Sequence, residues 1–277
     1  QYKHGIYHRF IVQERKRREI SVAGIRDRVV HRLLYEYLES IYDKTFIFDA
    51  WSCRKGKGLT GAIEGTHQYL KRFPRAFIWR ADIQKFFDNV DHAVLNQILF
   101  RKIIDQNAVA ILKEVIDSYY VAKSDKAVKG IPIGNLTSQV FANIYLNELD
   151  RYIKHQIKPS CYLRYGDDFV IIMNDLDHLQ YAKWLIKEFI SRELRLGINR
   201  KNDVVLKACQ GLRYLGVELF PSGRRLNKRN VARVRQRLNL TNAPSYFGVV
   251  SANKNTDEIK EFNWLLLKTM ENNPELL

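Results

Sequence analysis

Residues 162–172 read YLRYGDDFVII and place two adjacent aspartates, Asp167 and Asp168, between two runs of apolar and aromatic residues. The flanks predict two strands of a buried hairpin. Gly166, Asp167 and Asp168 form the predicted turn, because Gly and Asp tolerate the backbone angles of a tight turn. Adjacent carboxylates repel unless a cation joins them, and carboxylate oxygens suit Mg²⁺ or Mn²⁺. An isolated Asp-Asp pair is more often a surface turn, so the choice between a surface turn and a metal site depends on other residues of the chain.

A third aspartate favours a metal site over a surface turn. The stretch 76–83, AFIWRADI, predicts a short buried strand that ends near Asp82, and a helix capped by Asp91 follows it. Three carboxylates on adjacent strands can hold two divalent ions about 3.5–4 Å apart, an arrangement that activates a 3′-oxygen and stabilises a leaving pyrophosphate. Phosphoryl transfer needs little else from a protein beyond positioning and positive charge. The cluster therefore indicates nucleotidyl transfer, with Asp82, Asp167 and Asp168 as catalytic residues.

The charge of the chain favours the same chemistry. Its 277 residues contain 46 Lys and Arg against 30 Asp and Glu, a net charge of +16, which favours a polyanionic partner such as nucleic acid over a merely solvated basic surface. The three cysteines are far apart and lack a metal-binding spacing, which is typical of a reducing compartment. With no signal-like start and no long apolar run, we expect a cytoplasmic protein that does not enter a membrane.

The hydrophobic periodicity predicts a mixed α+β core with helical ends. The expected helices cover residues 26–42, 59–70, 89–100, 107–122, 139–156, 177–194 and 256–270. The expected strands cover 76–83, both sides of Gly166, 204–208 and 212–226. Residues 224–237 carry seven Arg or Lys and no acid, with Val231, Val234 and Leu238 at helical spacing. This segment predicts a basic helix that follows the phosphates of a duplex. The four tryptophans, Trp51, Trp79, Trp184 and Trp264, are expected to be core or packing residues.

These motifs resemble those of reverse transcriptases in order and spacing, over nearly the whole chain. The segments that carry the resemblance are 80–92, 130–150 and 163–171 for the palm, 15–34 and 54–58 for the fingers, and 194–206 and 213–220 for the late palm motifs. The resemblance implies a right-hand polymerase with a small antiparallel, ferredoxin-like palm sheet. It implies helical fingers in residues 1–75, a palm in 76–223 with inserted fingers helices around 93–129, and a short helical thumb in 224–277.

The resemblance also implies roles for single residues. Asp82 and Asp167 would bind two Mg²⁺ ions, with the carbonyl of Ile83 as a further ligand. Asp168 would lie beside them, either as a weaker ligand or as a carboxylate that supports the ligands without binding the ions directly. Phe87 would clash with a ribose 2′-OH and so favour dNTPs. The residues expected to bind the dNTP are Lys16, Arg18, Phe87, Ile133, Gly134, Gln139 and Lys201. Lys201 would correspond to the residue that donates a proton to pyrophosphate in this family, and Asn202 is the alternative for that position. The residues expected to bind nucleic acid are Arg54, Lys57, Arg224, Arg225, Lys228, Arg229 and Arg233.

The loop 133–139, IGNLTSQ, is distinctive within that family. Most bacterial relatives have Gln in place of Ile133, whereas the form IGxxxSQ resembles the reverse transcriptases of diversity-generating retroelements. Those enzymes copy a template RNA with frequent errors at adenine, and a small basic accessory protein that forms an oligomer often assists them. The alternatives are a group II-like, retron or phage-defence reverse transcriptase, a non-catalytic RNA-binding palm protein, and an RNA-dependent RNA polymerase, against which Phe87 argues.

Overall fold

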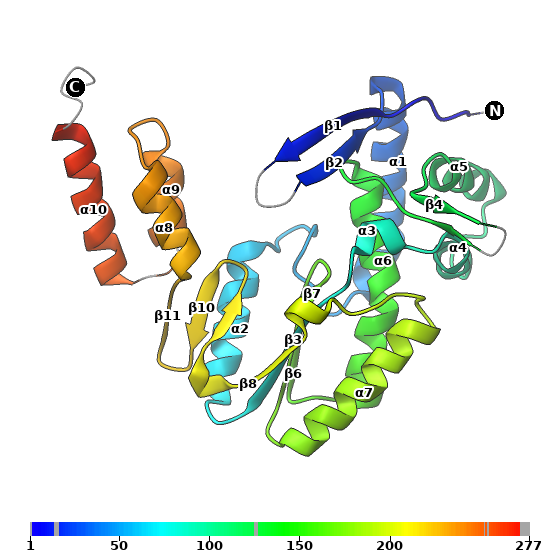
Figure 1. Ribbon diagram of the computed structural model, residues 1–277. Helices are drawn as coiled ribbons and strands as arrows, with labels where there is room; N and C mark the ends of the chain where they lie inside the picture. The colour runs from blue at the N-terminus through cyan, green and yellow to red at the C-terminus, as the bar shows by residue number, and fades with distance from the viewer. Residues whose placement is uncertain (1, 14–16, 125–126, 252, 254, 272–277) are drawn as a thin grey trace. The chain divides into compact units, whose positions relative to one another are not determined.

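The structure is a computed structural model that describes residues 2–13, 17–124, 127–251, 253 and 255–271 (Figure 1). The chain forms two compact units. The first contains residues 1–58 and 79–205, and the second contains residues 59–78 and 206–277. The division differs from consecutive fingers, palm and thumb segments, because residues 59–78 join the C-terminal part of the chain.

The first unit holds most of the helices and the segments that contain Asp82, Asp167 and Asp168. Its elements are β1 (His8–Gln13), β2 (Arg17–Val22), α1 (Ile25–Tyr42), η1 (Asp43–Thr45), α3 (Phe86–Asn89), α4 (His92–Phe100), α5 (Gln106–Asp117), β4 (Ala122–Lys123), β5 (Val128–Lys129), α6 (Leu136–Tyr152), the π-helical turn η2 (Ile153–Ile157), β6 (Cys161–Tyr165), β7 (Asp168–Met173), α7 (Leu176–Arg192) and η3 (Arg200–Asn202). Strands β3 (Phe77–Asp82) and β8 (Val204–Lys207) run from one unit into the other.

The central sheet has the strand order β6-β7-β3-β8. Strands β6 and β7 form an antiparallel hairpin in which Tyr165 pairs with Asp168. The turn therefore contains only Gly166 and Asp167, and Asp168 is the first residue of β7, which corrects the predicted three-residue turn. Gly166 has φ +63°, the left-handed backbone that glycine adopts without steric cost.

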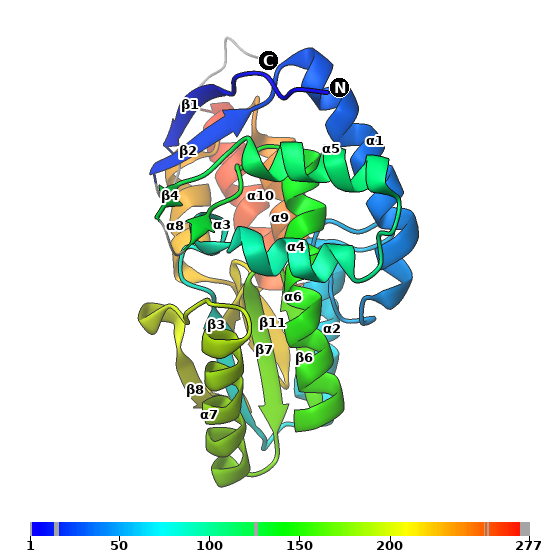
Figure 2. The same ribbon diagram turned by 90° about the vertical axis from the view of Figure 1, so that its right-hand side faces the viewer.

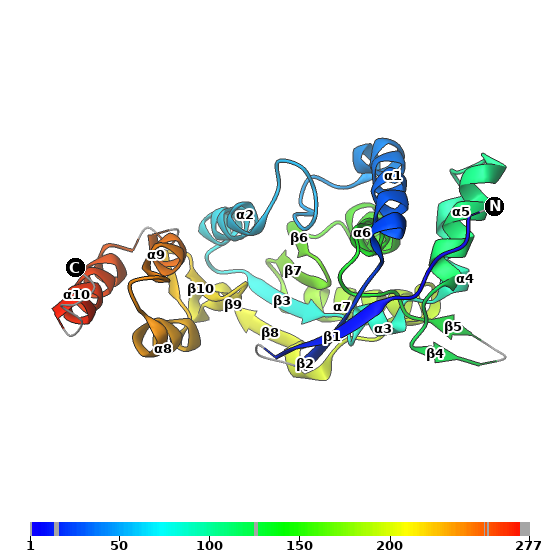
Figure 3. The same cartoon turned by 90° about the horizontal axis from the view of Figure 1, so that it is seen from above.

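Helices pack closely around this sheet. Helix α1 lies along α6 (Figures 1 and 3), and α7 packs beside β7 (Figure 2). The core is filled by fully buried side chains such as Leu38, Trp79, Tyr145, Tyr162 and Phe169. Burying one large apolar side chain contributes roughly 1.5–3 kcal/mol, so these contacts fix the sheet that carries the aspartates.

The second unit combines a small sheet with helices. Its elements are α2 (Leu59–Arg72), η4 (Ala208–Gln210), β9 (Leu212–Tyr214), β10 (Val217–Phe220), β11 (Gly223–Leu226), α8 (Lys228–Arg237), α9 (Ala243–Ser251) and α10 (Thr256–Glu271). Helix α2 packs on β10, and α9 packs on α10. The basic helix α8 begins only at Lys228, with Asn227 as its N-cap. Arg224 and Arg225 lie on β11, as the strand predicted over 212–226 requires, and the helix predicted over 224–237 is wrong at its start.

The mixed helix-and-sheet class is confirmed, and most helix and strand positions agree with the periodicity. The helix predicted over 107–122 is wrong at its end, because α5 stops at Asp117 and β4 begins at Ala122. Trp184 and Trp264 are 56% and 54% exposed, so of the two predicted places the core is excluded for them, and Trp184 packs against Tyr181 at the surface. No helix in the described part of the chain combines the length and the apolarity that crossing a membrane requires. The fingers, palm and thumb boundaries stay predictions.

Candidate active site

A cavity of about 740 Å³ in the first unit gathers most of the residues that were predicted to bind metal ions or the dNTP. Its lining comes from β2, the end of β3, α3, the loop before α6, α6 itself, the β6–β7 turn and η3. The predicted residues that line it are Arg18, Asp82, Ile83, Phe87, Ile133, Gln139, Asp167 and Lys201. These residues span most of the unit's sequence, so the fold rather than local sequence brings them together.

Asp82 is held firmly at the end of β3. The amide of Ile83 donates to the carbonyl of Asp167 over 3.1 Å, and the amide of Asn199 donates to the carbonyl of Asp82 over 2.9 Å. The side-chain amide of Asn202 donates to Asp82 Oδ2 over 2.7 Å. Among the described residues Asp82 Oδ1 is buried and accepts no hydrogen bond. A buried carboxylate oxygen without a donor is costly unless it binds a cation.

Asp167 is the second carboxylate of the cavity. Burial, together with the nearby charges of Asp82 and Asp168, raises the pKa of Asp167 from 3.8 to about 6, although Arg18 opposes this shift. The increase has the sign expected when negative groups are brought together in a site shielded from water. A divalent cation between Asp82 and Asp167 would remove this cost.

Asp168 lies outside this pair. It accepts from Arg80 Nε over 3.1 Å and from Arg80 Nη2 over 2.6 Å, and it does not line the cavity. Among the residues that the structure describes, no three His, Cys, Asp or Glu side chains are grouped to hold a metal ion. Asp82 and Asp167 thus line the cavity, and Asp168 lies near them with its carboxylate bound to Arg80. The assignment of all three carboxylates to a metal site stays a prediction.

The pair fits magnesium. Polymerase-type sites hold Mg²⁺ through one or two carboxylates, with waters and substrate phosphates completing the shell. The orphaned Oδ1 of Asp82 and the mutually repelling charges of Asp82 and Asp167 supply such a donor set. The residues that would hold the ions are Asp82, Asp167 and the main chain at Ile83.

The raised pKa of Asp167 predicts the pH dependence of metal binding. Because only the ionised carboxylate binds a cation, we expect the affinity of the protein for Mn²⁺ to rise about tenfold per pH unit below pH 6 and to level off above pH 7. Titrations followed by electron paramagnetic resonance between pH 5 and 8 would measure this. A flat profile would contradict it, and the slope should vanish in Asp167→Asn.

Two arginines of β2 face the same cavity. Arg18 was predicted to bind the triphosphate, and Arg17 joins it, although the sequence did not single out Arg17. Lys16 lies outside the described residues. Both arginines are exposed, and guanidinium groups bind phosphate oxygens in a bidentate manner.

The two adjacent phenylalanines after β3, Phe86 and Phe87, have different surroundings. Phe86 is buried and packs edge-on against Tyr145, with ring centroids 6.2 Å apart. Phe87 is only partly buried and lines the cavity, as its predicted role requires. The same helical turn thus contributes one residue to the core and one to the cavity wall.

Gly134 makes a different contact from the one predicted. It has φ +117°, and an added Cβ would lie 2.8 Å from the Cγ2 of Ile20. It does not line the cavity, whereas its neighbour Ile133 does. Glycine at this position lets the loop approach β2, and its close approach to a base pair stays a prediction.

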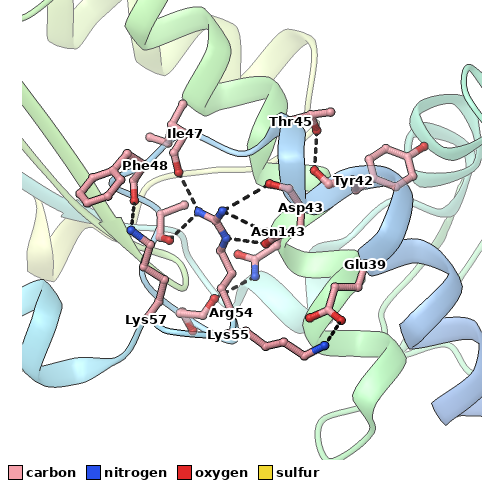
Figure 4. A network of polar contacts seen from close by, with 12 residues as sticks. Glu39, Tyr42, Asp43, Thr45, Ile47, Phe48, Arg54, Lys55, Lys57 and Asn143 are labelled. Carbon is pink, nitrogen blue, oxygen red and sulfur yellow. Dashed lines mark hydrogen bonds and ion pairs between the residues drawn. The ribbon is translucent and has the colours of Figure 1, made fainter.

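Arg54 stabilises the loop that follows η1 (Figure 4). Its guanidinium donates to Asp43 Oδ1 over 2.7 Å and to the carbonyls of Ile47 and Ala50 over 2.8 and 3.1 Å. Only 10% of its side chain is exposed. Arg54 therefore holds this loop in place, and its contact with nucleic acid stays a prediction.

Lys57 also folds back on the protein. Its ammonium donates to the carbonyl of Phe48 over 2.9 Å and lies 3.3 Å from the centroid of the Phe48 ring and 4.2 Å from that of Trp51. Burial lowers the pKa of Lys57. This cation–π contact competes with any phosphate for the same charge.

The basic residues of the second unit have mixed surroundings. Arg224 is buried and donates to Glu64 over 2.8 Å, and Arg225 pairs with Glu218 over 2.9 Å. On α8, Lys228 and Arg229 are exposed, and Arg233 is partly exposed. Helix α8 therefore presents its cations to solvent, whereas Arg224 serves the packing of its own unit.

A buried ion pair beneath the catalytic turn was missed from the sequence. Arg164 is 1% exposed and binds both carboxylate oxygens of Asp150, which is 0% exposed, over 2.8 and 2.7 Å. Arg164 also donates to the carbonyl of Gly166 over 2.9 Å, and Tyr162 donates to Asp150 over 2.6 Å. Arg164 therefore anchors the turn that carries Asp167.

Further residues near the carboxylates also escaped the sequence analysis. Asn199 and Arg80 were not considered, and Asn202 appeared only as a rival of Lys201 for a proton donor, whereas here it binds Asp82. The sequence feature that could have indicated these residues is the segment 194–206, which resembles a late palm motif and contains Asn199 and Asn202. Hydrogen bonds between residues some 120 positions apart cannot be read from such a pattern.

The comparison with known protein families identifies the fold that carries Asp82 and Asp167 as that of a polymerase. A family model described as reverse transcriptase (RNA-dependent DNA polymerase) matches residues 3–219. The chain belongs to this family, which confirms the resemblance at that level.

The curated relatives include group II intron proteins. Group II intron-encoded protein LtrA of Lactococcus lactis subsp. cremoris is 23% identical over 274 residues, covering 74% of this chain and 45% of that protein. The putative COX1/OXI3 intron 2 protein of Saccharomyces cerevisiae is 23% identical over 303 residues, covering 86% of this chain and 35% of that protein. The chain spans less than half the length of either relative.

Solved structures show the same fold at low sequence identity. Apo telomerase from Candida tropicalis has a TM-score of 0.63 and 11% identity, with 99% of this chain and 59% of that chain covered. Telomerase from Candida albicans, in complex with a TWJ fragment of telomeric RNA, has a TM-score of 0.61 and 13% identity, with 95% of this chain and 53% of that chain covered. At this identity the likeness concerns the fold alone.

Proposed function

We propose that the chain is the catalytic part of an RNA-directed DNA polymerase that works by two-metal nucleotidyl transfer. The observation that carries the proposal is the pair Asp82 and Asp167, with one orphaned buried oxygen and one raised pKa, in a cavity that also holds two arginines. Membership of the reverse transcriptase family supports it. When bound, Mg²⁺ would activate the primer 3′-oxygen and stabilise the leaving pyrophosphate.

Each group around the cavity has a separate task in this proposal. Arg17 and Arg18 bind the triphosphate of the incoming dNTP, and Phe87 excludes a ribose 2′-OH by its bulk. Asn202 fixes Oδ2 of Asp82, so that Oδ1 faces the cation. Lys201 and Gln139 also line the cavity, and Lys201 is the proposed proton donor to pyrophosphate.

Primer extension on a defined RNA template tests the proposal. The protein is incubated with a DNA primer, Mg²⁺ and either dNTPs or rNTPs. DNA products from dNTPs and few products from rNTPs are expected. A protein that binds the primer–template but extends it with neither substrate would instead be a non-catalytic RNA-binding palm protein.

We further propose that the enzyme belongs to a diversity-generating retroelement. The loop Ile133–Gln139 and the place of Ile133 in the cavity support this, because an apolar side chain offers no hydrogen bond to the nascent base pair. Its partners would then be a template RNA, a cDNA duplex, dNTPs and a small basic accessory protein, in the cytoplasm. The identity to LtrA favours a group II-like enzyme as the second candidate.

The substitution Ile133→Gln separates these two candidates. We expect it to lower misincorporation opposite template adenine about fivefold, since one restored hydrogen bond contributes about 1 kcal/mol to discrimination. Sequencing of products copied from one RNA by wild type and variant would measure the change. Equal error rates, or accurate copying by the wild type, would favour the group II-like reading.

A further inference from the structure

The loop before α6 is joined to the strand that carries the two cavity arginines. The amide of Ser21 donates to the carbonyl of Ile133 over 2.9 Å. Asn135 Nδ2 donates to the carbonyl of Ser21 over 2.7 Å, and the amide of Ala23 donates to Asn135 Oδ1 over 3.0 Å. Asn135 is 4% exposed and Ser21 is 1% exposed, so water does not compete for these bonds.

The surroundings of Asn135 show that its side chain serves β2 rather than its own helix. Asn135 is the N-cap of α6, where asparagine usually accepts a hydrogen bond from the first turn, yet it makes no such bond. Both ends of its amide bind the main chain of β2 and of the residue that follows it instead. Gly134, beside it, allows Ile20 of β2 to approach to a distance that a Cβ would forbid.

The hairpin β1–β2 is otherwise largely exposed. Arg17 and Arg18 are exposed, and burial along β2 begins only at Ile20 and Ser21. Arg18 lies three residues from Ser21, roughly 10 Å along the strand. A small rotation of β2 at Ser21 therefore displaces the arginines by a larger distance, because they lie farther along the strand.

We infer that Asn135 is a positioning residue that fixes the arginines of β2 over the cavity and couples them to Ile133. The inference rests on the proposed polymerase function. Asn135 touches neither substrate nor metal. It acts by holding Arg17 and Arg18 where the triphosphate of an incoming dNTP binds. The same strand is hydrogen-bonded to Ile133, in the loop that is proposed to face the nascent base pair.

Two variants of Asn135 test this inference. Asn135→Ser keeps a good N-cap for α6 but is too short to bridge Ser21 and Ala23, and Asn135→Asp keeps the size but cannot donate to Ser21. In primer extension we expect the KM for dNTPs to rise about tenfold while kcat changes by less than about threefold, the signature of lost ground-state binding. Amide exchange at Ser21 and Ala23 should become faster.

Asn147 provides the matched control, because it is a buried asparagine on the same helix and 4% exposed. Asn147→Ser should lower thermal stability and leave the KM for dNTPs unchanged. If both Asn135 variants keep the wild-type KM, or if Asn147→Ser raises KM equally, the inference is wrong. A wild type that makes no DNA would refute the polymerase function instead. Unchanged amide exchange at Ala23, whose amide donates to Asn135, would independently refute the role of Asn135 in holding β2.

Discussion

Asp167→Asn should lower the rate of primer extension by at least about 10³-fold while leaving the protein folded. The change removes one of two carboxylates available to the cations, and metal stabilisation of a transferring phosphoryl group contributes several kcal/mol to catalysis. The substitution is isosteric, so the β6–β7 turn keeps its shape. Single-turnover extension on an RNA template would measure the effect.

The same variant should be more stable than the wild type at neutral pH. Because the pKa of Asp167 is raised to about 6 in the folded protein, from 3.8, its ionised form disfavours the fold above pH 6. Asparagine removes that cost, so we expect a gain on the order of 2 kcal/mol at pH 7.5 and almost none at pH 4, measured without divalent cations. Thermal melts at the two pH values would show this difference.

Asp175→Asn is the control for both measurements. Asp175 caps α7, is largely exposed and lies on the chain just after β7, and asparagine caps a helix equally well. Neither rate nor stability should change by more than the error of measurement. Activity of Asp167→Asn within about tenfold of the wild type would refute the assigned role of this carboxylate.

Asp150→Ala should destabilise the protein by about 3–5 kcal/mol, the largest effect on stability that we expect from a single substitution. It removes the carboxylate that binds Arg164 through two hydrogen bonds, where both side chains are almost fully buried. A buried charge that loses its partner retains the whole cost of desolvation. Urea unfolding followed by circular dichroism would measure the loss, and a loss under 1 kcal/mol would contradict the prediction.

The double variant Asp150→Ala/Arg164→Met separates charge burial from positioning. Removing both charges should recover a large part of the stability lost in Asp150→Ala, because no unpaired charge is left in the core. Polymerase activity should remain low in the double variant, since the bond from Arg164 to the carbonyl of Gly166 is also lost. Full recovery of activity would show that the turn does not need Arg164.

The site was predicted from sequence where chemistry and local pattern coincide. A strand that ends in Asp82, a Gly-Asp-Asp turn between two β-forming runs and a basic chain sufficed to place Asp82 and Asp167 together. The same reasoning placed Asp168 with these carboxylates, but periodicity cannot reveal that Arg80 lies opposite it on the neighbouring strand. The basic loop 54–58 likewise does not reveal that Asp43 binds the guanidinium of Arg54.

The sequence by itself determined the mixed α+β class, the order of the palm motifs and two carboxylates of the site, since these depend on residue type and short-range periodicity. Only the tertiary structure decided which charges are neutralised within the protein and which face the cavity. Arg164, Asn135 and Asn202 act through hydrogen bonds to residues that are distant in sequence or part of the main chain. Such partners are set by the packing of strands and helices, which no local pattern of side chains records.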